Sequence, residues 1–138
     1  MPVRAVPNLA LQQVCAIHHQ RAEVDLAHYL FLVVSNPVAG REAEFNDWYS
    51  RQHLDDVLRV PGFTGARRFM VSGESRLPGR YVAIYELECA DPDAVLASLN
   101  ARAGTPDMPI SPALDVANVT IALLAPLTER LSAPRAAR

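Results

Sequence analysis

The stretch "EFNDWYSRQHLDDVLRVPGF", residues 44–63, places a tryptophan, a tyrosine and a histidine in one helical segment just ahead of a turn. Glu42 and Glu44 lie in the first turn of this segment, where carboxylates interact favourably with the helix dipole. Pro61 ends it, because the residue before a proline is driven out of helical geometry. The sequence therefore predicts a helix over residues 39–58, with a new element starting directly after the turn.

Four segments rich in β-branched and aromatic residues surround this helix and predict strands. One precedes it, at residues 28–35, and ends at an Asn-Pro turn signal. Two follow it, at residues 63–72 and 80–88, and the Gly/Ser/Pro loop between them predicts a hairpin. The last strand is expected at residues 116–124.

A second helix is marked at both of its ends. Asp91 is the expected N-cap, Pro92 occupies the first helical position, and Gly104 follows the last turn. The proline-rich stretch "TPDMPISPALD" (105–115), which contains Met108, suits a semi-rigid apolar flap over a cavity. The resulting order β-α-β-β-α-β predicts an α+β, ferredoxin-like fold, with a four-stranded antiparallel sheet and two helices on one face.

Two helices cover only one face of such a sheet, yet the predicted strands are apolar on both faces. An uncovered apolar face of this size would be an adhesive patch. In a chain this short, the same sheet of another copy is the expected cover. We therefore predict a homodimer whose sheets pack face to face into an α+β barrel.

The length of 138 residues fits one domain with a single core. We divide the chain into a flexible leader (residues 1–27), the α+β domain (residues 28–126) and a C-terminal tail (residues 127–138). Half of the residues are hydrophobic and the formal net charge is only −2. This balance is typical of a folded chain rather than a disordered one.

Composition disfavours several classes of partner. There is no basic excess to neutralise phosphates, which argues against nucleic acid. No apolar run approaches the roughly 20 residues of a membrane span. Cys15 and Cys89 form no disulfide framework and have no metal-ligand spacing. We expect a cytoplasmic protein without a metal site, whose partner is a small-molecule substrate or ligand.

The motif "SNPVAGREAEFNDWYSRQHLDDVLRVPGFTGARRF" (35–69), followed by "YVAIYELE" and a later "SPALD", resembles the EthD-like branch of the dimeric α+β barrel superfamily over residues 29–125. Proteins of that branch typically carry an aromatic pair and a histidine on the first helix, then Val-Pro-Gly and an aromatic residue. Relatives often have His-x-Pro where this chain has His53-Leu54-Asp55. The resemblance implies one of several activities, found in cofactor-free isomerases and cyclases, small monooxygenases of aromatic polyketides, muconolactone-type isomerases, and some haem proteins.

His53 is the first candidate catalytic residue. A neutral imidazole with an ordinary pKa near 6.5 can move a proton at neutral pH; the alternative is a surface histidine without a task. At 100° per residue, Phe45, Trp48, Tyr49 and Gln52 share one face of the helix and His53 lies at its edge. Trp48 and Tyr49 either line a binding pocket or pack as core aromatics with a polar end near water.

Arg68 is the second catalytic candidate. Strand alternation places it on the opposite face of the second strand from Phe63. The expected hairpin register puts Arg68 opposite Glu86, which predicts a structural ion pair. Alternatively, the guanidinium lies at a cavity wall and holds a substrate carboxylate or enolate. Tyr85, next to Glu86, either donates its hydroxyl to a ligand or simply packs.

The sequence contains no nucleotide-binding, nucleophile or metal-ligand motif, so its chemistry would be proton transfer without a cofactor. With the resemblance, this favours a cofactor-free isomerase or lyase acting on an oxygenated, anionic intermediate of aromatic, lactone or polyketide metabolism. Three alternatives stay open: a non-catalytic binding or accessory protein, a cofactor-free monooxygenase, and a haem protein with an axial histidine. The favoured interpretation assigns catalysis to His53 and Arg68, and substrate binding to Trp48, Tyr49, Tyr85, Glu86 and Met108.

Overall fold

The structure is a computed structural model that describes residues 26–135. The leader predicted over residues 1–27 lies outside the described residues, apart from its last two, and so do residues 136–138 of the predicted tail. The strands and helices follow one another in the predicted order. They are β1 (Ala27–Ser35), α2 (Glu42–Trp48), the π-helical segment η1 (Tyr49–His53), α3 (Leu54–Leu58), β2 (Phe63–Met70), β3 (Tyr81–Cys89), α4 (Pro92–Arg102), the 3-10 turn η2 (Val116–Asn118) and β4 (Thr120–Leu124).

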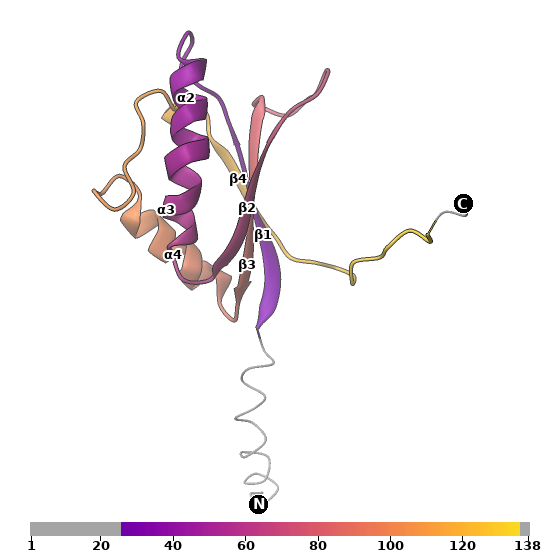
Figure 1. Ribbon diagram of the computed structural model, residues 1–138. Coiled ribbons are helices and arrows are strands. Elements are labelled where there is room, and N and C mark those ends of the chain that lie inside the picture. Colours follow the sequence, from indigo (N-terminus) through magenta and orange to yellow (C-terminus); the bar gives the residue numbers. More distant parts are fainter. Residues whose placement is uncertain (1–25, 136–138) are drawn as a thin grey trace, which may run out of the picture.

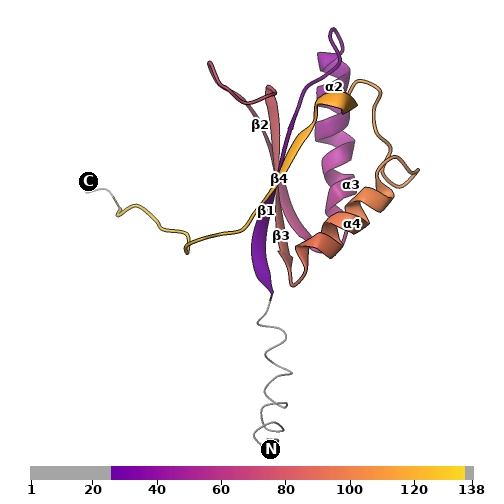
Figure 2. The same ribbon diagram turned by 180° about the vertical axis from the view of Figure 1, so that it is seen from behind.

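The four strands form one antiparallel sheet in the order β2-β3-β1-β4. The helices all lie on one face of this sheet, as two opposite views show (Figure 1, Figure 2). This arrangement confirms the predicted ferredoxin-like α+β fold. Because β1 and β3 are the central strands, their inward side chains form the floor on which the helices pack.

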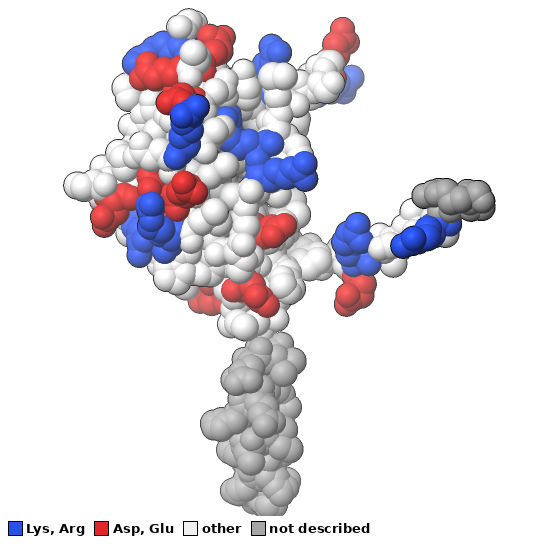
Figure 3. All heavy atoms as spheres, viewed as in Figure 1, with Lys and Arg blue, Asp and Glu red and all other residues white. Residues whose placement is uncertain are grey.

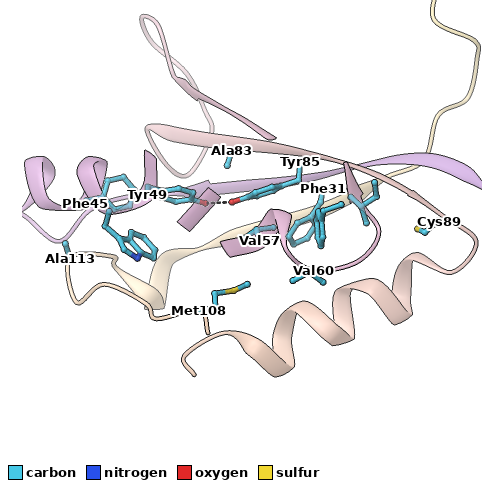
Figure 4. Packing of buried hydrophobic residues seen from close by; sticks show 13 residues of the cluster. Phe31, Phe45, Tyr49, Val57, Val60, Ala83, Tyr85, Cys89, Met108 and Ala113 are labelled. Atoms are coloured by element: carbon cyan, nitrogen blue, oxygen red, sulfur yellow. Dashed lines mark hydrogen bonds between the residues drawn. The ribbon is translucent and has the colours of Figure 1, made fainter. Parts of the chain in front are cut away.

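The hydrophobic core fills the space between the sheet and the helices (Figure 4). Phe31 of β1 pairs with Tyr85 of β3, and both side chains point to the helix-covered face. Phe45 of α2 is fully buried and packs edge-on against Tyr49, with ring centroids 5.5 Å apart. Burying each large apolar side chain contributes roughly 1.5–3 kcal/mol, so this layer holds the first helical segment on the sheet.

Helix α4 begins and ends where the sequence predicts. The Asp91 carboxylate accepts a hydrogen bond from the backbone N–H of Ala94 at 3.2 Å, and Pro92 is the first helical residue. Gly104 follows the helix with a φ of +87°, a conformation that side chains rarely adopt, and its N–H donates to the carbonyl of Met108 at 2.8 Å. This turn brings Met108 back into the core, where it is fully buried.

Strand β2 departs from simple alternation. A β-bulge between Phe63 and Gly65 shifts the register by one residue. Phe63 therefore shares the helix-covered face with Arg68, and the predicted separation of these two side chains is wrong. Arg68 pairs with Ala83, and Glu86 pairs with Gly65, so the predicted cross-strand pair of Arg68 and Glu86 is wrong as well.

The last strand is shorter than predicted. It begins at Thr120 rather than at residue 116, because Val116–Asn118 forms a 3-10 turn. The Asn118 side chain donates to the Asp115 carboxylate at 2.7 Å and fixes this turn. The chain therefore enters β4 from a loop that lies close to the helices.

The second face of the sheet carries many apolar side chains and faces away from the helices, and we call it the open face. Val34 and Val82 at one end of it are buried, whereas the rest is largely uncovered. The segment 125–135 leaves β4 on this side and extends away from the domain (Figure 1, Figure 2). Leu127 in this segment is 98% exposed. The side chains that point from the strands to the open face include Leu30, Leu32, Arg67, Phe69, Ile84, Glu86 and Leu124.

The outer surface of the helical layer carries acidic and basic side chains side by side (Figure 3). Arg51 pairs with Asp47 at 2.9 Å, and both are largely exposed. Such surface pairs contribute little to stability. Among the described residues, no group of three or more His, Cys, Asp or Glu side chains is placed to hold a metal ion, and no helix there is long and apolar enough to cross a membrane.

Candidate functional site

A cavity of about 200 Å³ lies between the sheet and the helical layer. Its floor comes from β1 and β3, and its walls come from η1, from α4 and from the loop that follows α4. Most of the lining is apolar. Ile121 of β4 lines one side of the cavity and is 59% exposed.

The π-helical segment explains how the histidine reaches this cavity. The N–H of Leu54 donates to the carbonyl of Tyr49, five residues earlier, which is the hydrogen bond of a π-turn. On a regular α-helix, Trp48 and His53 would point about 140° apart. Here their rings stack, with centroids 4.6 Å apart. Gln52, expected on the inner face, is instead exposed.

Trp48 is fixed at the wall of the cavity by the loop after α4. Its indole N–H donates to the carbonyl of Pro109 at 3.2 Å. The neighbouring Met108 is fully buried and also lines the cavity. The predicted flap is therefore packed against the pocket in this structure, and it holds the tryptophan that stacks on His53.

His53 lies in the cavity wall with a ring nitrogen that has no protein partner. Nδ1 is buried and makes no hydrogen bond to any described residue. Burial lowers the pKa of His53 to about 4; Asp56 raises this pKa and the positive charge of Arg68 lowers it further. The imidazole is therefore neutral at neutral pH, and its buried Nδ1 has no hydrogen-bond partner among the described residues.

Three hydroxyl groups meet at the floor of the cavity. The Tyr85 hydroxyl donates to the Tyr49 hydroxyl at 3.4 Å, and the two point toward one another in Figure 4. Ser35, at the end of β1, is 1% exposed, lines the same cavity and lowers the pKa of Tyr49 through a hydrogen bond. Burial nevertheless raises the pKa of both tyrosines, so both phenols are neutral.

Arg68 lies beside this hydroxyl cluster rather than in the cavity lining. Its guanidinium carbon is 4.5 Å from the centroid of the Tyr49 ring, a cation–π contact. Its terminal nitrogens donate to Asn46 Oδ1 and Ser50 Oγ, each at 2.8 Å. Burial lowers the pKa of Arg68, and the tyrosines act against this shift. The positive charge therefore acts on the Tyr49 phenol through its ring.

The structure brings together five of the seven predicted site residues. Trp48, Tyr49, His53, Tyr85 and Met108 all line the cavity. Arg68 is adjacent to it, whereas Glu86 points from β3 to the open face and is exposed. Sequence reasoning missed Ser35 and Asn100, which also line the cavity. Strand alternation could have found Ser35, because it lies four residues after the core residue Phe31.

No protein-family profile matches the chain, and no curated protein matches it in sequence. A point mutant of MhuD with two manganese protoporphyrin IX molecules bound per active site is structurally similar. It is 18% identical, the match covers 75% of this chain and 99% of that chain, and the TM-score is 0.51. The chain has the ferredoxin-like fold of this protein.

Two further solved structures are similar. The haem degrader MhuD from Mycobacterium tuberculosis, with two haems in its active site, is 18% identical over 74% of this chain and 98% of that chain, with a TM-score of 0.49. An EthD family protein from Bacillus halodurans is 12% identical over 75% and 99% of the two chains, with a TM-score of 0.48. An EthD family protein is thus among the similar structures. Likenesses at this level of identity show the fold alone.

Proposed function

We propose that the protein is a cofactor-independent enzyme of the isomerase or lyase type, which transfers a proton on a small oxygenated molecule. The observation that carries this proposal is the buried, unpartnered Nδ1 of His53 in a cavity wall. A buried polar atom without a partner is uncommon in folded proteins. A ligand in the cavity would supply that partner.

The reaction class follows from the state of His53. A neutral imidazole accepts a proton, but a pKa of about 4 makes it a weak base. It therefore removes only protons that neighbouring carbonyl groups have already made acidic. Carbon acids of this kind are typical of lactone and polyketide chemistry. Removing a proton at one carbon and returning it at another needs no oxidant and no cofactor.

The size of the cavity limits the substrate. An apolar protein cavity of about 150 Å³ holds one benzene molecule. At about 200 Å³, this cavity has room for one ring with small substituents. The stacked Trp48 and His53 offer a flat wall for such a ring.

Haem, or the manganese porphyrin that takes its place in one of the similar MhuD structures, does not fit these residues. A porphyrin has four pyrrole rings, whereas the cavity has room for one ring. No Arg or Lys side chain lines the cavity to pair with the haem propionates. We therefore derive no step through haem.

Arg68 takes a different part from the predicted anion clamp. Two of its nitrogens are bonded to Asn46 and Ser50, its buried Nε has no partner among the described residues, and the side chain does not line the cavity. We propose that Arg68 is a positioning residue, whose charge strengthens the Tyr49 phenol as a hydrogen-bond donor.

We also propose that the working unit is a homodimer joined through the open face. Phe69 and Leu124 on this face are each 42% exposed. Arg67 and Glu86 lie on the same face with opposite charges, so the face can pair with a copy of itself. The extended segment 125–135 leaves on this side and would gain contacts only from a partner surface. The cytoplasmic location stays a prediction, in agreement with the free thiol of Cys89.

The proposal is tested with a probe that contains one ring and one carbonyl. Isomerisation of 3-cyclohexen-1-one to its conjugated 2-enone removes a proton next to the carbonyl and returns it at the far end of the double bond. It is followed by ultraviolet absorbance. We expect the full-length protein to accelerate this reaction and His53→Gln to lose at least 100-fold in kcat/KM, the scale of general-base catalysis.

The matched control is His28→Gln, because His28 is exposed, lies near the start of β1 and does not line the cavity. This variant should keep the wild-type rate. Equal rates for His53→Gln and wild type would contradict the proposal. A wild-type protein that binds the ring without isomerising it would identify a binding protein instead.

A further inference from the structure

The side chains of Ser35, Tyr49 and Tyr85 form a hydroxyl cluster that is almost completely buried. Its members come from three different elements, and all three side chains are at most 3% exposed. Burying a hydroxyl is costly unless it is well hydrogen-bonded. Yet the one bond between the phenols is 3.4 Å long, whereas O–H···O bonds are usually about 2.5–3.0 Å. The bond between the two phenols is therefore weak, and a stronger acceptor in the cavity would replace it.

The cavity beside this cluster carries no formal charge at neutral pH. No Asp, Glu, Lys or Arg is among its lining residues. His53 is neutral because burial lowers its pKa to about 4, and burial raises the pKa of the two phenols. The nearest cation, Arg68, is bonded to Asn46 and Ser50. An ionised ligand would lose its hydration here without gaining a direct ion pair.

We propose that the hydroxyl cluster binds the oxygen atom of an uncharged, ring-sized carbonyl compound, such as a cyclic ketone or a lactone. This differs from the anionic substrate expected from the sequence. The inference deepens the proposed function and rests on it for the reaction, but not for the binding. A carbonyl oxygen accepts hydrogen bonds from the phenols, while the rest of the ring lies on the apolar wall beside Trp48.

In the proposed reaction the cluster holds the oxygen on which charge develops. His53 takes the proton from the carbon next to the carbonyl, and the electron pair of that C–H bond moves to form an enolate. The Tyr85 hydroxyl gives up its long bond to Tyr49 and turns to the ligand. The enolate oxygen then accepts stronger hydrogen bonds from Tyr49 and Tyr85, as it would from donors in an oxyanion hole. The proton returns to another carbon, so atoms and electrons balance without a co-reactant. Such donors stabilise an enolate that forms in the site more than an anion that must first shed its water.

The test uses three probes of similar size and the single tryptophan of the chain as reporter. Acetophenone has a ring and a carbonyl, benzoate has a ring and a charge, and ethylbenzene has a ring alone. Each is titrated into the 15N-labelled full-length protein, and the Trp48 indole N–H signal is followed by NMR. We expect acetophenone to bind best, ethylbenzene more weakly, and benzoate weakest.

The variant Tyr85→Phe removes one hydroxyl and keeps the ring. It should weaken acetophenone binding about two- to tenfold, the scale of one net hydrogen bond, and leave ethylbenzene binding unchanged. Tyr29→Phe is the matched control, because Tyr29 packs at the edge of the core and does not line the cavity. Should Tyr85→Phe not fold, Tyr49→Phe makes the same prediction.

Three results would overturn the inference. They are tighter binding of benzoate than of acetophenone, equal losses of acetophenone and ethylbenzene affinity in Tyr85→Phe, and the absence of any indole shift with acetophenone. The titrations need no turnover, so the two proposals separate. Tyr85-dependent binding of acetophenone in a protein that does not isomerise 3-cyclohexen-1-one would support the hydroxyl site and refute the proton-transfer function.

Discussion

The two faces of the sheet come from the same strands but are built differently. On the helix-covered face, Tyr85 is 1% exposed, and its hydroxyl is buried against a cavity. The next residue along β3, Glu86, points to the open face and is exposed. On that face Phe69 and Leu124 leave large apolar surfaces uncovered. The protein thus buries polar groups on one side and exposes apolar groups on the other.

This difference between the two faces of the sheet indicates two different functions. Buried hydroxyls and an unpartnered imidazole nitrogen reduce stability, so they are expected where a ligand completes them. Exposed apolar side chains in a contiguous patch are expected where another protein surface covers them. We therefore propose that the covered face binds the substrate and that the open face forms the dimer interface.

The largest expected contrast is between one phenylalanine on each face. Phe45 is fully buried beneath the helices, so Phe45→Ala should lower the free energy of unfolding by about 3–5 kcal/mol. Phe69 is 42% exposed on the open face, and Phe69→Ala should cost at most about 1 kcal/mol at low protein concentration. Urea denaturation measures both. Similar losses for the two variants would remove the distinction between the faces.

A second prediction concerns acid. The pKa of His53 is about 4 in the folded protein and about 6.5 in the unfolded chain, so the unfolded chain binds a proton first as the pH falls. The free energy of unfolding should therefore drop by roughly 3 kcal/mol between pH 7 and pH 4, beyond the loss from other groups. In His53→Gln this part of the slope should be absent. Parallel pH profiles for wild type and variant would mean that His53 is not buried.

A third prediction tests the open face. Ile84→Asp places a charge in the centre of the proposed dimer interface and should raise the dimer dissociation constant about 100-fold. The control Leu58→Asp makes the same chemical change on the helical layer, where Leu58 is 37% exposed. It should leave the assembly intact. Light scattering after gel filtration gives the mass, and a wild-type monomer would refute the proposed assembly.

Much of the fold could be predicted because local signals agree with one another. Asp91, Pro92 and Gly104 mark α4 at both ends, and the structure confirms them. Apolar runs separated by turn residues predict where the strands lie along the chain. Such signals act over a few residues, so the sequence alone contains them.

The orientation of the site residues was harder to predict, for one physical reason. At two places the chain contains one residue more than a regular α-helix or a regular β-strand would. The π-turn at Tyr49–His53 swings His53 onto Trp48 and leaves Gln52 exposed. The bulge after Phe63 brings Phe63 to the same face of β2 as Arg68. The hairpin pairs Met70 with Tyr81, three residues away from the predicted register, and this separates Arg68 from Glu86. Rules of 100° per residue and of strict alternation carry no signal for such insertions, which tertiary packing decides.

The central claim is that His53 is a neutral, buried group in a ligand cavity. The most direct measurement is an NMR titration of its imidazole between pH 3 and pH 8, with and without acetophenone. We expect a pKa of about 4 for His53 and a shift of the His53 signals when acetophenone binds. A pKa near 6.5 with no response to acetophenone would contradict it, because His53 would then be an exposed helix residue beside packed aromatic rings.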